Sequence, residues 1–348
     1  MLLCCLLCFI AVIVSIYLFV LLRLIGSYIG GRLTGYTLQE ITFLEKYYRK
    51  ENGKLTLVKG EKRNVIGSCG MVPPEREDGK IPIWLHLFMG SVLVCVVAVA
   101  LPVLCTVFKP HYLIFTPTVI LAVMLLIYLI PLFLRYEKLP NGEFRKSRKG
   151  KNLISWTAEA AKDRDSLLYG MNKGLIMFEI LNSNKRCKDL PERWFKKPEH
   201  VNDPDRFAVG TLCVDRYMDF HQFKEALEYG EWLLENAGEA VTDQLKAVLK
   251  AELLFLEIIL YKRREKIDAY FPDVADYIGK YPQCLSSHRV KYAYGRFIND
   301  SVTAKQARDE FEKMLPDYKF RAIAEAEQEI MDIFDRECPL PKPITIGG

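Results

Sequence analysis

The chain has 348 residues, of which 50% are hydrophobic, and its formal net charge at pH 7 is +5. A positive charge favours nucleic-acid binding when it lies on a compact soluble domain, but much of it here lies beside long apolar segments. Anionic lipid headgroups provide the counter-charge in that setting. The chain also lacks the recognised nucleic-acid-binding signatures, so we expect no nucleic-acid partner.

Three apolar segments predict membrane-spanning helices. Residues 2–22, 83–108 and 112–134 contain no Asp, Glu, Lys or Arg. Each is as long as the roughly 20 residues that a helix needs to cross a bilayer. A cleaved signal peptide is the alternative for the first segment, but no basic region precedes it and no small-residue cleavage site follows it. We therefore expect an integral membrane protein in contact with the lipid bilayer.

Basic residues near the membrane predict the orientation. The region that follows the third span is strongly basic, with Arg135, Lys138, Arg145, Lys146, Arg148, Lys149 and Lys151. The loop between the first two spans is also rich in Lys and Arg, whereas the connection at 109–111 is short. This distribution predicts an N-terminus outside, three crossings and a cytoplasmic C-terminal domain.

The end of the first span carries a distinctive segment. Residues 23–36 read Arg-Leu-Ile-Gly-Ser-Tyr-Ile-Gly-Gly-Arg-Leu-Thr-Gly-Tyr. They resemble the first membrane helix of the site-2 proteases, which are intramembrane zinc metalloproteases. In these enzymes a His-Glu-x-x-His pattern supplies two metal ligands and a general base. Arg23 and Ser27 stand at the His positions and Leu24 at the Glu position, so the resemblance implies a protease scaffold without its catalyst.

Further segments resemble the same family, in a bacterial branch with a C-terminal cytoplasmic helical domain. Residues 50–55 match its short strand pair, and residues 67–75 match the glycine-rich, Pro-Pro stretch before its second core helix. Gly142 stands where the third ligand, an Asp, is expected. The resemblance implies a pseudoprotease in a bacterial membrane, with no catalytic residue, no cofactor and no bound zinc.

From Lys151 onward the pattern indicates amphipathic helices. We expect them at 153–181, 206–218, 220–236, 242–261, 266–281, 285–299, 303–315 and 320–336. Successive helix pairs of this length are typical of tetratricopeptide-like repeats. The full repeat signature does not recur at a fixed period, so an irregular helical bundle stays an equal alternative.

Chemistry-bearing residues do not form a recognisable catalytic set. His86 is the only imidazole within a span, and we interpret it as an interfacial hydrogen-bonding residue. The five cysteines outside the apolar segments lack a Cys-x-x-Cys partner, so no soluble zinc site is expected; they are Cys69, Cys187, Cys213, Cys284 and Cys338. Aromatic residues outside the core pattern are our candidates for partner binding, because exposed aromatic residues are enriched at interfaces. These candidates are Trp194, Phe195, Tyr292 and Tyr294.

The expected fold class is all-α, with a three-helix transmembrane core of site-2-protease type before a soluble tetratricopeptide-like or bundle domain. The predicted divisions are a first span at 1–31, a loop with a strand pair at 32–82, a transmembrane hairpin at 83–134, a basic linker at 135–152, a helical domain at 153–338 and a flexible tail at 339–348.

Three hypotheses for function follow. The first is a protease-like membrane protein that binds a protein or peptide partner without cleaving it. The second is a membrane-anchored scaffold with no protease-like role, and the third is a metalloprotease with non-standard ligands. An unwound, glycine-lined cleft between the first and third spans would favour the first hypothesis over the second, and bound zinc would favour the third.

Overall fold

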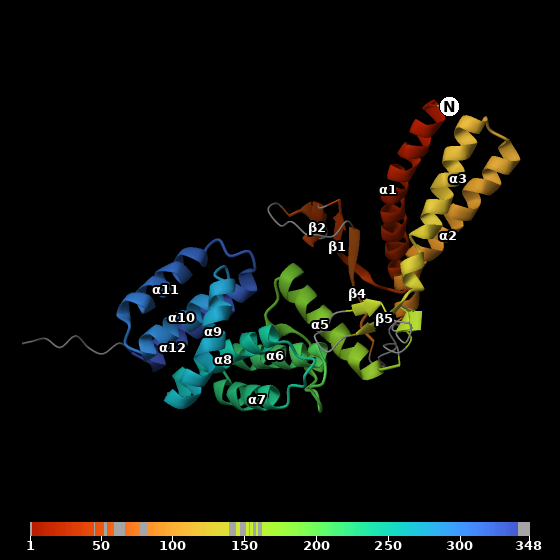
Figure 1. Cartoon of the computed structure of the whole chain (residues 1–348). Coiled ribbons are helices and arrows are strands. Elements are labelled where there is room, and N and C mark those ends of the chain that lie inside the picture. Colours follow the sequence, from red (N-terminus) through yellow and green to blue (C-terminus); the bar gives the residue numbers. More distant parts are fainter. Residues whose placement is uncertain are drawn as a thin grey trace, which may run out of the picture. The chain divides into compact units, whose positions relative to one another are not determined.

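The structure is a computed structural model that describes residues 2–44, 46–51, 54–58, 67–76, 82–138, 144–146, 151–152, 154–155, 158 and 162–339. It is mostly helical (Figure 1). The chain divides into two compact units, Met1–Met171 and Asn172–Gly348. The expected third metal position, Gly142, and residues 340–348 of the expected tail lie outside the described residues.

The first unit contains three long apolar helices: α1 (Leu2–Leu33), α2 (Ile83–Phe108) and α3 (Tyr112–Ile127). A short 3₁₀ turn (Ile130–Leu132) extends α3. All three segments, the last counted to Leu132, are long and apolar enough to cross a membrane. The prediction of three candidate spans is therefore confirmed, and α1 continues well beyond Leu22.

Glycines allow α1 to approach α2 closely. A Cβ atom at Gly26 would lie 2.4 Å from the Cα of Gly90, and one at Gly30 would lie 2.3 Å from the Leu85 carbonyl oxygen. Small residues are common where membrane helices pack, because they let the backbones come together. Farther along the bundle, the Ser15 hydroxyl lies 3.1 Å from that of Tyr128 on the α3 side.

The first unit also contains two small antiparallel sheets, so the expected all-α class is wrong in this respect. One sheet has the order β3-β2-β1-β4, formed by β1 (Thr37–Phe43), β2 (Lys46–Glu51), β3 (Lys54–Leu57) and β4 (Gly67–Val72). The other has the order β6-β5-β7, formed by β5 (Arg135–Lys138), β6 (Phe144–Lys146) and β7 (Lys151–Asn152). Strands β2 and β3 occupy the place of the expected strand pair, and β1 and β4 extend it.

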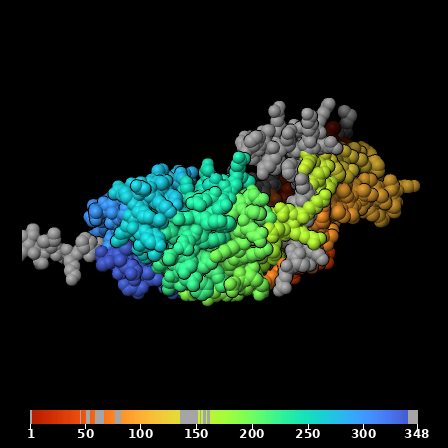
Figure 2. Space-filling view, turned by 90° about the horizontal axis from the view of Figure 1, so that it is seen from below, coloured from red at the N-terminus to blue at the C-terminus, as the bar shows by residue number. Residues whose placement is uncertain are grey.

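The second unit is helical, as the periodicity predicts. It begins within α5 (Arg164–Asn182) and continues through α6 (Pro204–Asp219), α7 (Phe223–Glu235), α8 (Asp243–Leu260), α9 (Arg264–Lys280), α10 (Leu285–Phe297), α11 (Ser301–Met314) and α12 (Arg321–Glu337). From α6 onward each helix lies within a few residues of its predicted range. On the face shown in Figure 2 the green to blue helices form a continuous packed surface.

Helix pairs build this unit. Helix α6 packs on α7, α8 on α9 and α10 on α11. The first helices of the pairs also contact one another in sequence, and α12 contacts both α10 and α6. We call α6, α8, α10 and α12 the inner helices. Because α12 returns to α6, the inner helices form a closed circuit.

Candidate functional site

The inner helices surround a cavity of about 270 Å³. Each of them contributes an ionisable side chain to its lining: Asp215 from α6, Glu252 from α8, Arg289 from α10 and Glu327 from α12. Helix α5 and α9 add Met177 and Tyr277. A cavity of this size is near the lower end of the roughly 300–1,000 Å³ typical of small-ligand sites. We call this the inner cavity.

The four ionisable side chains are almost evenly spaced along the sequence. Arg289 follows Glu252 by 37 residues and precedes Glu327 by 38. Asp215 precedes Glu252 by the same 37 residues (252 − 215). This near-even spacing places one of these residues on each inner helix. The cavity therefore gathers residues that lie far apart in the sequence.

Arg289 holds two inner helices together at the centre. Its Nε donates to Glu327 Oε2 at 2.6 Å, and its Nη2 donates to Glu252 Oε2 at 2.7 Å. Only 1% of the Arg289 side chain is exposed, and its guanidinium lies 4.3 Å from the Phe255 ring. Burial lowers the pKa of Arg289, but the two carboxylates raise it by more. The guanidinium therefore stays charged in an apolar setting.

Asp215 differs from the two glutamates because it has no compensating partner. It makes no hydrogen bond or ion pair with any residue that the structure describes. Burial raises the pKa of Asp215 well above its ordinary value, and the nearby carboxylates of Glu252 and Glu327 raise it further. Arg289 opposes this shift. The same cause, burial, raises the pKa of Glu327. The inner cavity thus holds an acid that is costly to ionise.

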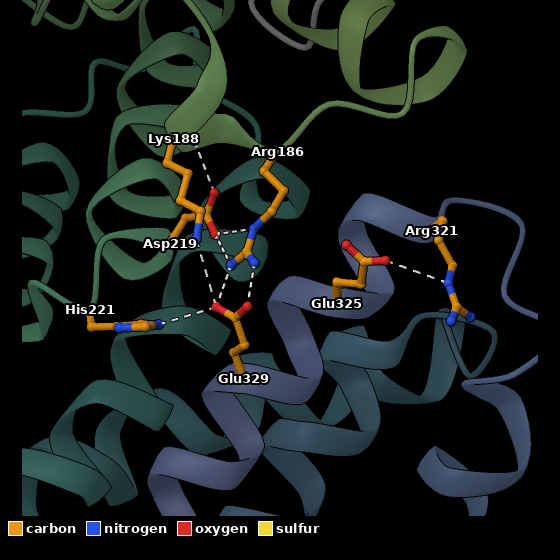
Figure 3. A network of polar contacts seen from close by, with 7 residues as sticks. All are labelled: Arg186, Lys188, Asp219, His221, Arg321, Glu325 and Glu329. Carbon is orange, nitrogen blue, oxygen red and sulfur yellow. Dashed lines mark hydrogen bonds and ion pairs between the residues drawn. The ribbon is translucent and has the colours of Figure 1, made fainter.

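A second network lies beside the cavity (Figure 3). Arg186, from the segment after α5, donates from Nε to Asp219 at 2.8 Å and from Nη1 and Nη2 to Glu329 at 2.6 and 2.8 Å. The backbone N–H of Lys188 donates to the other oxygen of Asp219 at 2.9 Å. The Arg186 hydrogen bonds lower the pKa of Glu329 to about 2. Arg186 therefore links α6 to α12, where the circuit of inner helices closes.

The raised pKa of Asp215 predicts a pH-dependent gain in stability on substitution. An acid with a raised folded-state pKa stabilises the fold when protonated, and that contribution is lost as the pH rises from its unfolded value, about 3.9, through its folded value. Asn at position 215 does not ionise, so the Asn variant does not lose stability in this way as the pH rises. We therefore expect Asp215→Asn to raise the Tm relative to the wild type, by an amount that grows with pH from about 4 upward.

Thermal unfolding of both proteins between pH 4 and pH 8 measures this difference. Glu252, Glu327, Arg289 and Asp219 face position 215 in both proteins, so the substitution removes one ionisable group and leaves its charged neighbours in place. A Tm difference that shrinks as the pH rises would contradict the assignment of Asp215 as a group that is costly to ionise.

The aromatic candidates for partner binding are not exposed. Trp194, Phe195 and Tyr292 keep only 8%, 7% and 7% of their surface. Tyr294 is partly buried and stacks on Phe271, with ring centroids 3.8 Å apart. The expectation that they form an exposed patch is therefore wrong, and it no longer supports them as partner-binding residues.

Specific contacts explain this burial. The Phe195 ring lies 4.6 Å from the Arg216 guanidinium, and the backbone carbonyl oxygen of Phe195 accepts a hydrogen bond from the Cys213 thiol. The Tyr292 hydroxyl donates to Asp335 and accepts from Arg296, both at 2.6 Å. Phe195 and Tyr292 therefore pack against neighbouring helices, and the Tyr292 hydroxyl has hydrogen-bond partners there.

Arg23, Leu24 and Ser27, which stand at the positions of the metal ligands and the base, lie within the uninterrupted helix α1. The guanidinium of Arg23 lies 5.8 Å from the Phe19 ring. His86 Nδ1, on α2, lies 3.1 Å from the Ser27 carbonyl oxygen, and the imidazole stacks on the Tyr36 ring. These contacts fit a hydrogen-bonding role for His86. Among the described residues, no group of three His, Cys, Asp or Glu side chains is arranged to hold a metal ion.

The inner cavity is the feature that sequence reasoning missed. Its signal was available, because Glu252 directly precedes the apolar run Leu253 to Leu256 and shares its 37-residue spacing with Asp215 and Arg289. A charged residue surrounded by apolar neighbours on a helix must be buried with partners or serve a function. Comparison with known proteins adds no candidate, since no family model, curated protein or solved structure matches the chain.

Proposed function

We propose that the protein is a membrane-anchored binding protein. Its three apolar helices would fix it in the lipid bilayer, and the inner cavity would take a small group belonging to a protein or peptide partner. The observation that carries this proposal is the convergence of ionisable side chains from all four inner helices on a single cavity. Buried charges are costly, so folds retain them mainly where they specify structure or bind a ligand.

Photo-crosslinking in membranes tests this function. A benzophenone amino acid at Met177, which lines the cavity and is 37% exposed, should crosslink to a discrete partner. The matched control is the same amino acid at Val302, which is 76% exposed on α11. A partner captured at position 177 and not at 302 supports the proposal. Equal capture at both positions, or no capture at 177, contradicts it.

The partner would be bound without being cut. This part of the proposal rests on the resemblance of α1 to the first helix of site-2 proteases, in which Arg23, Leu24 and Ser27 replace the ligands and the base. Neither an arginine nor a leucine supplies what a hydrolytic zinc needs, which is about three ligands and an open position for water.

The packing of α1 favours the simple scaffold over the protease-like hypothesis. Helix α1 runs without interruption from Leu2 to Leu33. The backbone of α2 occupies the space beside Gly26 and Gly30, where a side chain would otherwise lie. These glycines therefore serve close helix packing, and they do not line an unwound cleft against α3. A membrane anchor that needs no protease-like role accounts for the same residues.

Metal content distinguishes the simple scaffold and the protease-like binding protein from an active protease. We expect the purified full-length protein to contain no stoichiometric zinc and to cleave no membrane peptide. Elemental analysis after purification without chelators measures the zinc. About one zinc per chain, lost on changing His86 or a cysteine of the apolar helices, would overturn this expectation.

We further propose that the C-terminal unit is cytoplasmic and that the bilayer is that of a bacterial cell. The basic residues after the third span support this orientation. On a background without native cysteines, a single cysteine at Lys109 should react with a membrane-impermeant reagent from outside. A cysteine at Lys149 should react only after permeabilisation, and the reverse pattern would contradict the three-span topology.

A further inference from the structure

Among the ionisable side chains of the inner helices, the glutamates are more exposed to the cavity than the arginine is. Glu252 and Glu327 keep 10% and 12% of their side-chain surface, whereas Arg289 keeps 1%. The Nη1 atom of Arg289 is enclosed and has no hydrogen-bond partner among the described residues. The carboxyl groups of Glu252 and Glu327 are therefore more accessible from the cavity than the Arg289 guanidinium is.

Each cation in the cavity lining is already paired with a carboxylate. Lys185 Nζ lies 2.9 Å from Glu179, and Arg186 binds Asp219 and Glu329. Arg289 is shared between Glu252 and Glu327. One positive charge between two carboxylates leaves a negative excess, to which Asp215 adds when it is ionised. The uncompensated charge at the centre of the cavity is therefore negative, which selects against an anionic ligand.

The walls of the cavity are aliphatic. They consist largely of branched and unbranched alkyl side chains from α5, α6, α8 and α12: Met177, Ile180, Leu212, Val248, Ile323 and Ile330. Alkyl walls around a few polar groups favour a ligand with an apolar body and one polar end. The small volume limits that body to a short chain.

We propose that the inner cavity binds a primary ammonium group on a short aliphatic stem, with Asp215 as its carboxylate partner. The proposal rests on the proposed binding function and names the chemical group that the cavity takes from its partner. The ammonium would supply the three donors that Asp215 and its neighbours lack, and the stem would lie against the alkyl walls. The group has two sources, a free alkylamine or a lysine side chain of a protein.

Binding would be linked to a proton. In the empty cavity burial and the carboxylates of Glu252 and Glu327 raise the pKa of Asp215, Arg289 lowers it, and Asp219 adds a smaller repulsion. An ammonium group favours the ionised form, so it lowers the pKa of Asp215. Binding at a pH below the pKa of the empty site therefore releases a proton, and affinity rises with pH up to that value.

Calorimetric titration of the full-length protein in detergent tests the charge preference. The probes are pentylamine, pentanol and pentanoate, which share a five-carbon stem and differ in charge. We expect pentylamine to bind most tightly and its binding to weaken by at least about tenfold in Asp215→Asn, because a charge-assisted hydrogen bond is lost. Asp309→Asn, on the exposed surface of α11, is the matched control and should bind as the wild type does.

Two acetylated tripeptides, Gly-Lys-Gly with and without acetylation of the lysine ammonium, distinguish the sources. If the unmodified peptide binds and the lysine-acetylated peptide does not, the group belongs to a protein partner. If pentylamine binds and neither peptide does, the group belongs to a free amine. Pentanol or pentanoate binding as tightly as pentylamine, no binding of pentylamine, or unchanged pentylamine binding in Asp215→Asn overturns the inference. If partner crosslinking at position 177 persists in that case, the binding function stands and only the ligand assignment fails.

Discussion

Replacing Arg289 with Leu should destabilise the helical unit by about 3–5 kcal/mol, because it leaves Glu252 and Glu327 buried without their shared cation. The two carboxylates would take up protons to relieve the repulsion, so the loss of stability should be larger at pH 8 than at pH 5. Chemical unfolding of the full-length protein, followed by the helical circular dichroism signal, measures both effects.

The control for this change is Arg264→Leu on α9. Arg264 pairs with Asp268 on the same helix, and their side chains are 66% and 49% exposed. A surface pair of this type contributes only about 0–1 kcal/mol. If the two substitutions cost the same, Arg289 does not hold the inner helices together.

Replacing Leu253 with Asp should unfold the helical unit. Leu253 is fully buried on α8, and it packs against the position of Gly230 on α7. A carboxylate there has no partner, and a buried unpaired charge costs far more than a domain's usual stability margin. Leu253→Met, which nearly conserves volume, should cost less than about 1.5 kcal/mol. Protease digestion of the full-length protein would report the difference, and resistance of the Asp variant would contradict the core assignment.

A substitution at Trp232 on α7 should have a smaller effect than the one at Leu253. It is only partly buried, with its ring stacked on Tyr229 at a centroid distance of 5.7 Å. Its sequence position predicts a full core residue, but the structure places it at the border of the core. Trp232→Asp should therefore destabilise the unit less than Leu253→Asp does, since the new carboxylate can reach water.

The sequence predicts the helices of both units well, for a local reason. Uncharged runs longer than a bilayer and apolar positions at helical spacing are properties of neighbouring residues. Helices α6 to α12 therefore begin and end close to their predicted positions. The sheet β3-β2-β1-β4 is harder to predict, because β4 pairs with β1 across a long separation in the sequence, whereas its other strand pairs are between sequence neighbours.

The candidate site depends on non-local packing, which one sequence does not display. Trp194 and Tyr292 have the composition of interface residues, but Tyr292 reaches Asp335 and so is drawn inward. The partners of Arg289 lie 37 and 38 residues away, on different helices. Once the helix pairs are known, that spacing shows which charged residues meet. Without the pairing, Glu252 is one acidic residue among many on amphipathic helices.

The occupant of the inner cavity is the most direct measure of the proposed function. A crystal or cryo-electron microscopy structure of the full-length protein with pentylamine should show the nitrogen of the amine within hydrogen-bond distance of the Asp215 carboxylate. Its alkyl chain should lie against Leu212 and Ile323, and Arg289 should keep both of its glutamate partners. Side chains that fill the cavity, or pentylamine bound only elsewhere on the protein, would contradict a binding role for the inner helices.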